Sequence, residues 1–480
     1  MAETPAVAPS SAPASPKGPL ERILSVFADV QGGEGLTAIL LTFNVFLLLT
    51  SYYLLKVARE PLILASGAEV KSYASAGQAV LLIGVVKLYS KLAQHVGRMR
   101  LTTCVFLFFA ACLVVFFLLG QMKVPLGIPF FLWVGIFNVT AIAQFWSFAA
   151  DIYTEKQGKR LFAIVGIGSS VGAVLGAKIA GWLFKPLGPY ALMLIAGAIL
   201  VGCLGITFVV HRRELARVAA VKAEKQAERA SEAPMGKEGG FTLLLRDKYL
   251  LLVGALTLIL NWVNTSGEYI LDRTLLKAAA EKGLTGEAAE QFIGAFKAGY
   301  FSWVNIVGVV LQLFVVSRVF KYLGVRVALF VLPVIALGGY GTLLVYPMLG
   351  AIMVAKVAEN SVDYSLQNTA RQALFLVTTH EEKYKAKNVI DTFIVRFGDV
   401  LSAGVVLVGT KLAFDTHHFI MVNVGLAACW IVVAVFLGRE HKKRLREGGH
   451  ADSHAGGPPE DPKKAVVAPV LSPSHSGSGA

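Results

Sequence analysis

Charged residues are scarce in this chain, because Asp, Glu, Lys and Arg together make up only 16% of its 480 residues. Hydrophobic residues make up 55% of the chain. Several nearly uncharged runs exceed the roughly 18 residues that a helix needs to cross a bilayer. These proportions are typical of a membrane protein with several spans.

Cysteine is also rare, and each of the four cysteines lies inside an apolar run: Cys104, Cys112, Cys203 and Cys429. This placement argues against a disulfide framework or a zinc site and predicts small buried side chains. No nucleophile–base or zinc-ligand motif stands in a suitable context either. We therefore expect neither an enzyme nor a protein that needs a cofactor.

The formal net charge of +14 does not indicate a nucleic-acid partner, because most of the excess Lys and Arg flanks the apolar runs. Basic loops follow the second, fourth, sixth, eighth and tenth runs, and such loops usually face the cytoplasm. We therefore expect an even number of spans in a bacterial inner membrane, with both termini in the cytoplasm. The expected partner is the lipid bilayer, and the expected state is a monomer.

The apolar runs fall into two groups of six, separated by a long polar and basic segment. A serine, a basic residue and a glycine recur at the same spacing after the second and eighth runs, at Ser90, Lys91 and Gly97 and at Ser317, Arg318 and Gly324. The sequence thus predicts an all-α polytopic membrane protein with about twelve transmembrane helices in two pseudo-symmetric six-helix bundles, the major-facilitator architecture. The expected order is a disordered cytoplasmic tail (1–35), an N-terminal bundle (36–210), a cytoplasmic central loop (211–247), a C-terminal bundle (248–437) and a second disordered tail (438–480).

Three glycines in the fifth run repeat every four residues, at Gly168, Gly172 and Gly176. Small residues at this spacing allow two membrane helices to approach closely. A dinucleotide-binding loop is excluded, because no strand precedes the glycines and the third one is misplaced. We therefore expect this face to pack against another helix.

The stretch 347–404 is apolar enough for two membrane helices, yet it is rich in charge. Four polar residues in it are spaced at i, i+3, i+4 and i+7, so a helix places them on one face: Lys356, Glu359, Asn360 and Asp363. A charge at the centre of a lipid-facing helix costs at least roughly 2.5–3.5 kcal/mol. These side chains must therefore face protein or a water-filled cavity.

We hypothesise that cations from several helices converge on an anionic small molecule in a central cavity. The candidate substrate-binding residues are Lys56, Arg59, Asn264, Lys297, Lys356, Arg371 and Arg396. The candidate gating or coupling residues are Glu60, Glu268, Glu359, Asp363 and Asp399. The sequence leaves three roles open for the charges: internal ion pairs such as Lys356–Glu359 and Arg396–Asp399, salt bridges of a gate, or a carboxylate that carries a proton.

Three segments resemble the ATP/ADP translocases of plastids and intracellular bacteria: YYLLKVAREPLIL, FWSFAADIYT and DYSLQNTARQALFLVTTHEEKYKAKNVIDTF. The resemblance assigns the family's basic–acidic pattern of the first span to Lys56, Arg59 and Glu60, and a basic position of the tenth span to Arg371. The chain departs from the family pattern at Gln372, which replaces an acid. In an approximate register, Val134 and Asn264 stand where the family carries glutamates.

The resemblance implies a secondary-active transporter that exchanges a nucleotide or a related phosphorylated anion by alternating access. A proton-coupled transporter of another organic solute is the first alternative. The second is a non-transporting membrane scaffold or sensor on a transporter fold. Uptake that follows a pH gradient without counter-substrate would favour the first, and fully paired midplane charges without a cavity would favour the second.

Overall fold

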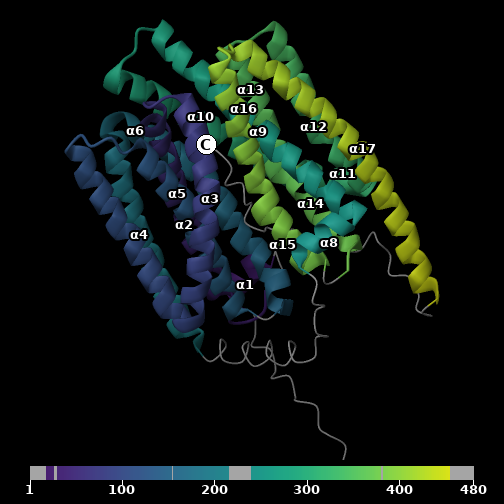
Figure 1. Cartoon of the computed structure of the whole chain (residues 1–480). Coiled ribbons are helices and arrows are strands. Elements are labelled where there is room, and N and C mark those ends of the chain that lie inside the picture. Colours follow the sequence, from purple (N-terminus) through teal and green to yellow (C-terminus); the bar gives the residue numbers. More distant parts are fainter. Residues whose placement is uncertain (1–17, 26–29, 154, 216–238, 380–381, 455–480) are drawn as a thin grey trace, which may run out of the picture.

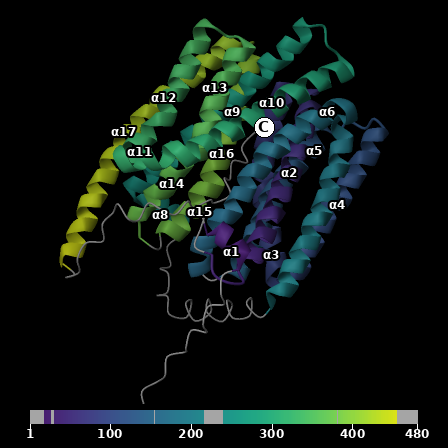
Figure 2. The same ribbon diagram turned by 180° about the vertical axis from the view of Figure 1, so that it is seen from behind.

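The computed structural model describes residues 18–25, 30–153, 155–215, 239–379 and 382–454, and within these ranges all regular structure is helical. The helices form two bundles that stand side by side, as two opposite views show (Figures 1 and 2). Among the described residues, nine helices are long and apolar enough to cross a membrane. Helix α6 supplies two spans, and α3 and the interrupted α13–α14 helix are two more, so the described ranges contain twelve spans.

The N-terminal bundle is built from long uninterrupted helices. A short helix α1 (Pro19–Leu24) precedes α2 (Gly35–Leu64), α3 (Ala68–His95), α4 (Arg98–Gln121), α5 (Gly127–Ile152) and α6 (Glu155–Arg213). Helix α6 turns back at Gly188, whose φ of 70° favours glycine, between Pro186 and Pro189. This corner separates the expected fifth and sixth spans.

The C-terminal bundle contains more breaks. Its elements are α8 (Gly240–Arg246), α9 (Lys248–Glu281), α10 (Gly286–Leu311), η1 (Gln312–Val316), α11 (Ser317–Tyr322), α12 (Gly324–Val345), α13 (Leu349–Val362), η2 (Asp363–Gln367), α14 (Asn368–Leu374), η3 (Phe375–Val377), η4 (Glu382–Ala386), α15 (Lys387–Val389), η5 (Ile390–Ile394), α16 (Val395–Lys411) and α17 (Thr416–His454). Elements η1, η2, η4 and η5 are π-helical turns, which often accompany functional sites. Helix α10 packs against α2 and α6, and α16 and α9 pack against α3, so these helices form the interface between the bundles.

The segments expected to be disordered are partly helical. Helix α1 lies within 1–35, and α17 continues to His454 instead of ending at Leu437. The extension is held because Arg444 of α17 pairs with Asp247 and with Glu382. Buried acids also occur at both edges of the N-terminal bundle, Glu34 in the expected tail and Glu214 in the expected central loop.

The glycine face of α6 packs against α2, which confirms the prediction from its spacing. A methyl group on Gly172 would lie 2.5 Å from the carbonyl oxygen of Phe46, and one on Gly176 would lie 2.8 Å from the Cα of Thr50. Only a residue without a side chain fits so close to a neighbouring backbone.

The cysteines are all free, but only Cys203 is buried, and Cys104 and Cys429 are exposed on the outer faces of their helices. The expectation of burial is wrong for these two, because apolar positions in a membrane bundle can equally face lipid.

Candidate functional site

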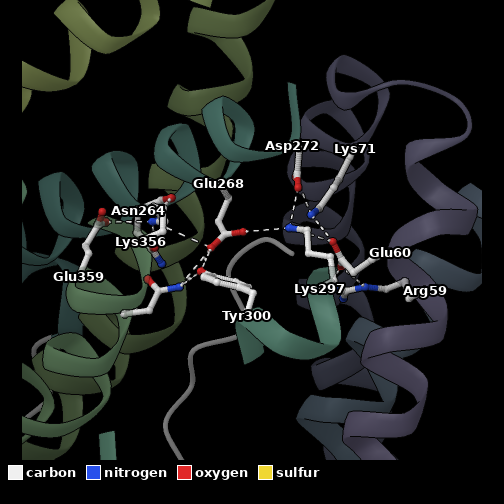
Figure 3. A network of polar contacts seen from close by, with 11 residues as sticks. Arg59, Glu60, Lys71, Asn264, Glu268, Asp272, Lys297, Tyr300, Lys356 and Glu359 are labelled. Carbon is white, nitrogen blue, oxygen red and sulfur yellow. Dashed lines mark hydrogen bonds and ion pairs between the residues drawn. The ribbon is translucent and has the colours of Figure 1, made fainter. Parts of the chain in front are cut away.

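Four charged side chains meet between the two bundles and form what we term the interbundle ion cluster: Glu60, Lys71, Asp272 and Lys297 (Figure 3). Lys71 Nζ of α3 lies 2.6 Å from Glu60 Oε2 and 2.7 Å from Asp272 Oδ2 of α9. Lys297 Nζ of α10 lies 2.5 Å from Asp272 Oδ1 and 3.4 Å from Glu60 Oε2 of α2. Each lysine therefore bridges a carboxylate of one bundle to a carboxylate of the other.

The cluster continues into the C-terminal bundle through Glu268 of α9. Its carboxylate accepts hydrogen bonds from Tyr300 Oη at 2.5 Å and from Asn360 Nδ2 at 3.1 Å, and Lys297 Nζ lies 3.5 Å away. On its other side Lys356 Nζ lies 4.0 Å from Glu268. Glu268 thus connects the interbundle ion cluster to a second buried cation.

Lys356 is bound entirely by groups of its own bundle. Its Nζ donates to Asn264 Oδ1 at 2.7 Å and to Glu359 Oε1 at 3.1 Å, and Tyr340 Oη donates to the other oxygen of Glu359 at 2.7 Å. The side chain of Lys356 is 1% exposed. The internal Lys356–Glu359 pair, one of the roles that the sequence left open, is therefore present in this structure.

The connected network is balanced in charge. On the N-terminal side Arg59 also pairs with Glu60, at 2.8 Å, and its guanidinium lies 4.5 Å from the centre of the Phe131 ring. The network then holds four cations, Arg59, Lys71, Lys297 and Lys356, and four carboxylates, Glu60, Glu268, Asp272 and Glu359. Burying so many charges is tolerable only because each one has partners of opposite sign.

A cavity of about 180 Å³ lies between the bundles, beside the network. Helices α2, α5 and α6 line one side of it, and α10, η1, η2 and α14 line the other. Its polar and aromatic lining residues are Tyr52, Tyr53, Lys56, Asn138, Trp146, Ser169, Ser170, Asn305, Gln312, Tyr364 and Asn368. On α2, the lining residue Lys56 stands four positions before Glu60, so the cavity begins roughly 6 Å along the helix axis from the interbundle ion cluster.

Lys56 is a buried cation that lines this cavity. Its side chain packs among aromatic rings, with Nζ 4.2 Å from the centre of Phe301 and 5.6 Å from that of Tyr53. Among the residues that the structure describes, no carboxylate oxygen lies within 4.0 Å of Nζ. Aromatic faces stabilise an ammonium group only partly, so Lys56 can still bind an anion.

The remaining candidates lie on the elements from η2 to α16 and are not among the residues that line the cavity. Arg396 Nη1 is 3.4 Å from Asp399, and the same carboxylate accepts from Asn261 at 2.9 Å and Thr265 at 2.8 Å. Asp399 thus ties α16 to α9 within one bundle. In the described part of the chain, Asp363 Oδ1 and Arg371 Nε are buried without a hydrogen-bond partner.

The sequence analysis missed two members of the interbundle ion cluster, Lys71 and Asp272. Neither is among the predicted site residues, because both lie just outside the apolar runs of the second and seventh spans. A signal was present on α9, because Asn261, Asn264, Glu268 and Asp272 follow one another at helical spacing. The lining amides Asn138, Gln312 and Asn368 were also missed, since uncharged polar residues in a membrane helix are weak signals.

The chain is similar to a known protein family and to known proteins. Residues 35–379 match the family model described as the Major Facilitator Superfamily. The chain is 21% identical over 343 residues to ADP,ATP carrier protein 1 of Chlamydia pneumoniae, covering 63% of this chain and 64% of that protein. The same carrier of Chlamydia muridarum is 24% identical over 343 residues, covering 63% of this chain and 62% of the carrier. The chain thus spans less than two thirds of the length of these curated relatives.

Solved structures share the fold at low sequence identity. A POT family transporter in complex with 5-aminolevulinic acid superposes with a TM-score of 0.58 at 12% identity, over 85% of this chain and 96% of that one. The nucleoside transporter NupG superposes with a TM-score of 0.59 at 12% identity, over 85% and 99%. At such identity the likeness establishes the arrangement of the helices and leaves the cargo open.

Proposed function

The chain belongs to the Major Facilitator Superfamily, and from that premise we propose that it exchanges a nucleotide or a related phosphorylated anion across the bacterial inner membrane by alternating access. Transport itself agrees with the family and with the transporter folds that superpose on the chain. The observation that carries the proposal is Lys56, a buried cation that lines a cavity between the bundles without a carboxylate in contact. The distant likeness to ADP,ATP carriers supports a phosphorylated cargo.

In this proposal Lys56 attracts the anionic group of the substrate, and the rings around the cavity hold its organic part. Tyr52, Tyr364 and Trp146 present flat apolar surfaces on which a ring can stack. The present cavity of about 180 Å³ is smaller than the roughly 300–1,000 Å³ of typical small-molecule sites. Binding of a nucleotide therefore requires the bundles to move apart at the end of the cavity that faces away from the interbundle ion cluster.

The interbundle ion cluster acts as the gate on the opposite side. The N-terminal bundle supplies two network cations, Arg59 and Lys71, against one carboxylate, Glu60, whereas the C-terminal bundle supplies Lys297 and Lys356 against three carboxylates. The two sides are thus oppositely charged and attract each other at this end. Opening the gate separates Lys71 from Asp272 and Lys297 from Glu60, and water entering the gap then solvates the freed charges.

The other predicted residues have supporting roles in this mechanism. Glu268, Asn264 and Glu359 hold Lys297 and Lys356 in place, so that the gate closes in one geometry. Arg396 and Asp399 orient α16 against α9. Arg371, predicted as a substrate contact, lies outside the lining, one turn beyond Asn368, and in this mechanism its charge balances the buried carboxylate of Asp363.

The test is exchange by the purified full-length chain in liposomes loaded with nucleotide or sugar phosphate. We expect external labelled substrate to enter only when counter-substrate is present inside, and Lys56→Gln to abolish this exchange. Binding is measured separately by thermal stabilisation, since a ligand at a hundredfold excess over Kd stabilises the fold by about 2.7 kcal/mol. Uptake that is independent of internal substrate would refute antiport.

One observation favours proton-coupled transport as a second candidate. Asp363 is a buried carboxylate with an oxygen that lacks a hydrogen-bond partner among the described residues, and such a group can accept a proton. Uptake driven by a pH gradient into liposomes without counter-substrate, and lost in Asp363→Asn, would support it. The scaffold alternative has no comparable support, because a cavity is present.

A further inference from the structure

The lining of the cavity carries very little charge. Among the described residues that line it, Lys56 is the only charged one, and no carboxylate is present. The polar groups of the lining are otherwise hydroxyls and amides, which are neutral. A ligand in this cavity therefore contacts one positive charge.

The neighbouring cations do not add to this charge, because each already interacts with a carboxylate. Arg59 lies 2.8 Å from Glu60, and Lys297 lies 2.5 Å from Asp272. Arg396 is 3.4 Å from Asp399. Arg371 lies outside the lining, and its charge acts on the buried carboxylate of Asp363. Each pair behaves from a distance as a dipole, so the uncompensated positive charge of the lining is that of Lys56.

Three side-chain amides around the cavity have no partner among the described residues and can bind a planar polar ring. In the described part of the chain, no hydrogen bond to another residue is made by the side chains of Asn138 of α5, Gln312 of η1 and Asn368 of α14. Each offers both donors and an acceptor. Asn305, by contrast, is occupied, since it accepts from Tyr53 Oη at 2.9 Å and donates to the carbonyl of Ala173 at 3.3 Å.

We propose that the substrate has a single anionic head group, one phosphate or one carboxylate, attached to a planar ring with hydrogen-bonding edges, and that nucleoside di- and triphosphates are poor substrates. A phosphate monoester already carries about −1.5 to −2 charges at pH 7. Each further phosphate adds charge that one lysine cannot neutralise, and uncompensated charge in a buried site is strongly unfavourable. This inference rests on the proposed function and narrows its substrate class.

The first test compares ligands on the purified full-length chain at equal ionic strength. AMP tests a ring with one phosphate, and nicotinate tests a ring with one carboxylate. Adenosine lacks the anionic group, and ribose 5-phosphate lacks the planar ring. ADP and ATP carry one and two further phosphates. We expect AMP or nicotinate to bind at least tenfold more tightly than ADP and a hundredfold more tightly than ATP, by thermal shift and by exchange in liposomes.

The possible results separate this inference from the proposed function. If ADP or ATP binds as tightly as AMP and exchanges, nucleotide exchange stands and the single-charge inference is overturned. If nicotinate alone binds and exchanges, the inference is supported and the phosphorylated cargo is refuted. If none of the six compounds binds, both are overturned.

Variants of the cavity test the charge itself. Lys56→Gln should weaken the binding of AMP or nicotinate at least tenfold and leave the binding of adenosine unchanged. Lys56→Arg should keep most of the affinity for AMP or nicotinate. Lys178→Gln, which removes an exposed lysine of α6, is the matched control. Ser170→Lys places a second cation in the cavity and should raise the affinity for ADP relative to that for AMP about tenfold. An unchanged ADP/AMP ratio in a folded Ser170→Lys protein would count against the inference, and the ligand series on the unaltered chain decides it if that variant does not fold.

Discussion

Lys71 Nζ and Asp272 Oδ2 lie 2.7 Å apart although 201 positions separate the two residues in the sequence. They belong to α3 and α9, which are on opposite sides of the interface between the bundles. Both side chains are almost fully buried, at 5% and 2% exposure. The pair therefore joins the bundles directly, and its geometry can exist only while this end of the interface is closed.

Neutralising one partner should weaken that closure. In Asp272→Asn the two lysines of the interbundle ion cluster lose a shared counter-charge, so we expect the open state at this end to become more populated. Spin labels at Ser66 and Thr285, which lie in the adjoining loops, should report a longer mean distance by pulsed electron paramagnetic resonance. Glu281→Gln on the same helix removes a 65% exposed acid and serves as control. Identical distance distributions in the two variants would contradict a gate at Asp272.

Removing the central cation of the cluster should strongly lower the stability of the fold. Lys297→Met leaves three buried carboxylates, Glu60, Glu268 and Asp272, without their shared lysine. Breaking a buried ion pair on one side costs roughly 3–5 kcal/mol. We expect a much lower melting temperature in detergent than for the unaltered chain.

The control for Lys297→Met is Lys277→Met, which removes a lysine with a side chain 72% exposed in an i, i+4 pair. An exposed pair of this kind contributes only about 0.3–0.5 kcal/mol. Similar melting temperatures for the two variants would show that Lys297 is not essential to the buried network.

Local patterns in the sequence were sufficient to predict the membrane-spanning helices, but they did not predict which charged residues pair with one another. The cost of charge in lipid predicted that Lys356 and Glu359 face protein, and both are buried. The same argument could not tell a substrate contact from an internal pair, because Asn264, which binds Lys356, is 92 positions away. Lys71 was overlooked for the same reason, since its role appears only when α9 lies beside α3.

The end of the last helix shows a similar limit. Apolar composition stops near Leu437, and the sequence analysis ended the helix there. The helix runs on to His454, with Arg444 bound to Asp247 and Glu382 of other segments. Composition identifies where a helix leaves the bilayer, whereas its actual end depends on partners that only the fold brings near.

Arg444 should therefore matter for the stability of the C-terminal bundle. Its guanidinium pairs with two carboxylates and lies 4.5 Å from the centre of the Tyr249 ring. Hydrogen bonds to charged groups contribute roughly 1.5–3 kcal/mol each, so Arg444→Ala should lower the melting temperature and speed amide exchange at the start of α9. Lys442→Ala, an exposed neighbour, should do neither. Equal protection of the α9 amides in both variants would mean that α17 does not hold this helix.

The contact between α6 and α2 offers a test of the packing that supports the cavity. In Gly172→Ala the new methyl group meets backbone atoms of Phe46, the carbonyl oxygen at 2.5 Å and Cα at 2.9 Å. Because backbone atoms cannot swing aside as a flexible side chain can, the helices must separate, and overpacking of this kind costs about 1–3 kcal/mol. The lining residues Ser169 and Ser170 lie on the same turns of α6, so we also expect weaker substrate binding.

Gly205→Ala is the matched control on the same helix, since its methyl group would meet nothing within 4 Å. The intrinsic helix preference of alanine over glycine is about 1 kcal/mol, so this variant should be neutral or slightly stabilised. The melting temperature of Gly172→Ala should therefore be lower than that of Gly205→Ala, although the chemical change is the same. A stabilised Gly172→Ala would show that α2 and α6 have room to spare at this crossing, and that the cavity does not depend on their close approach.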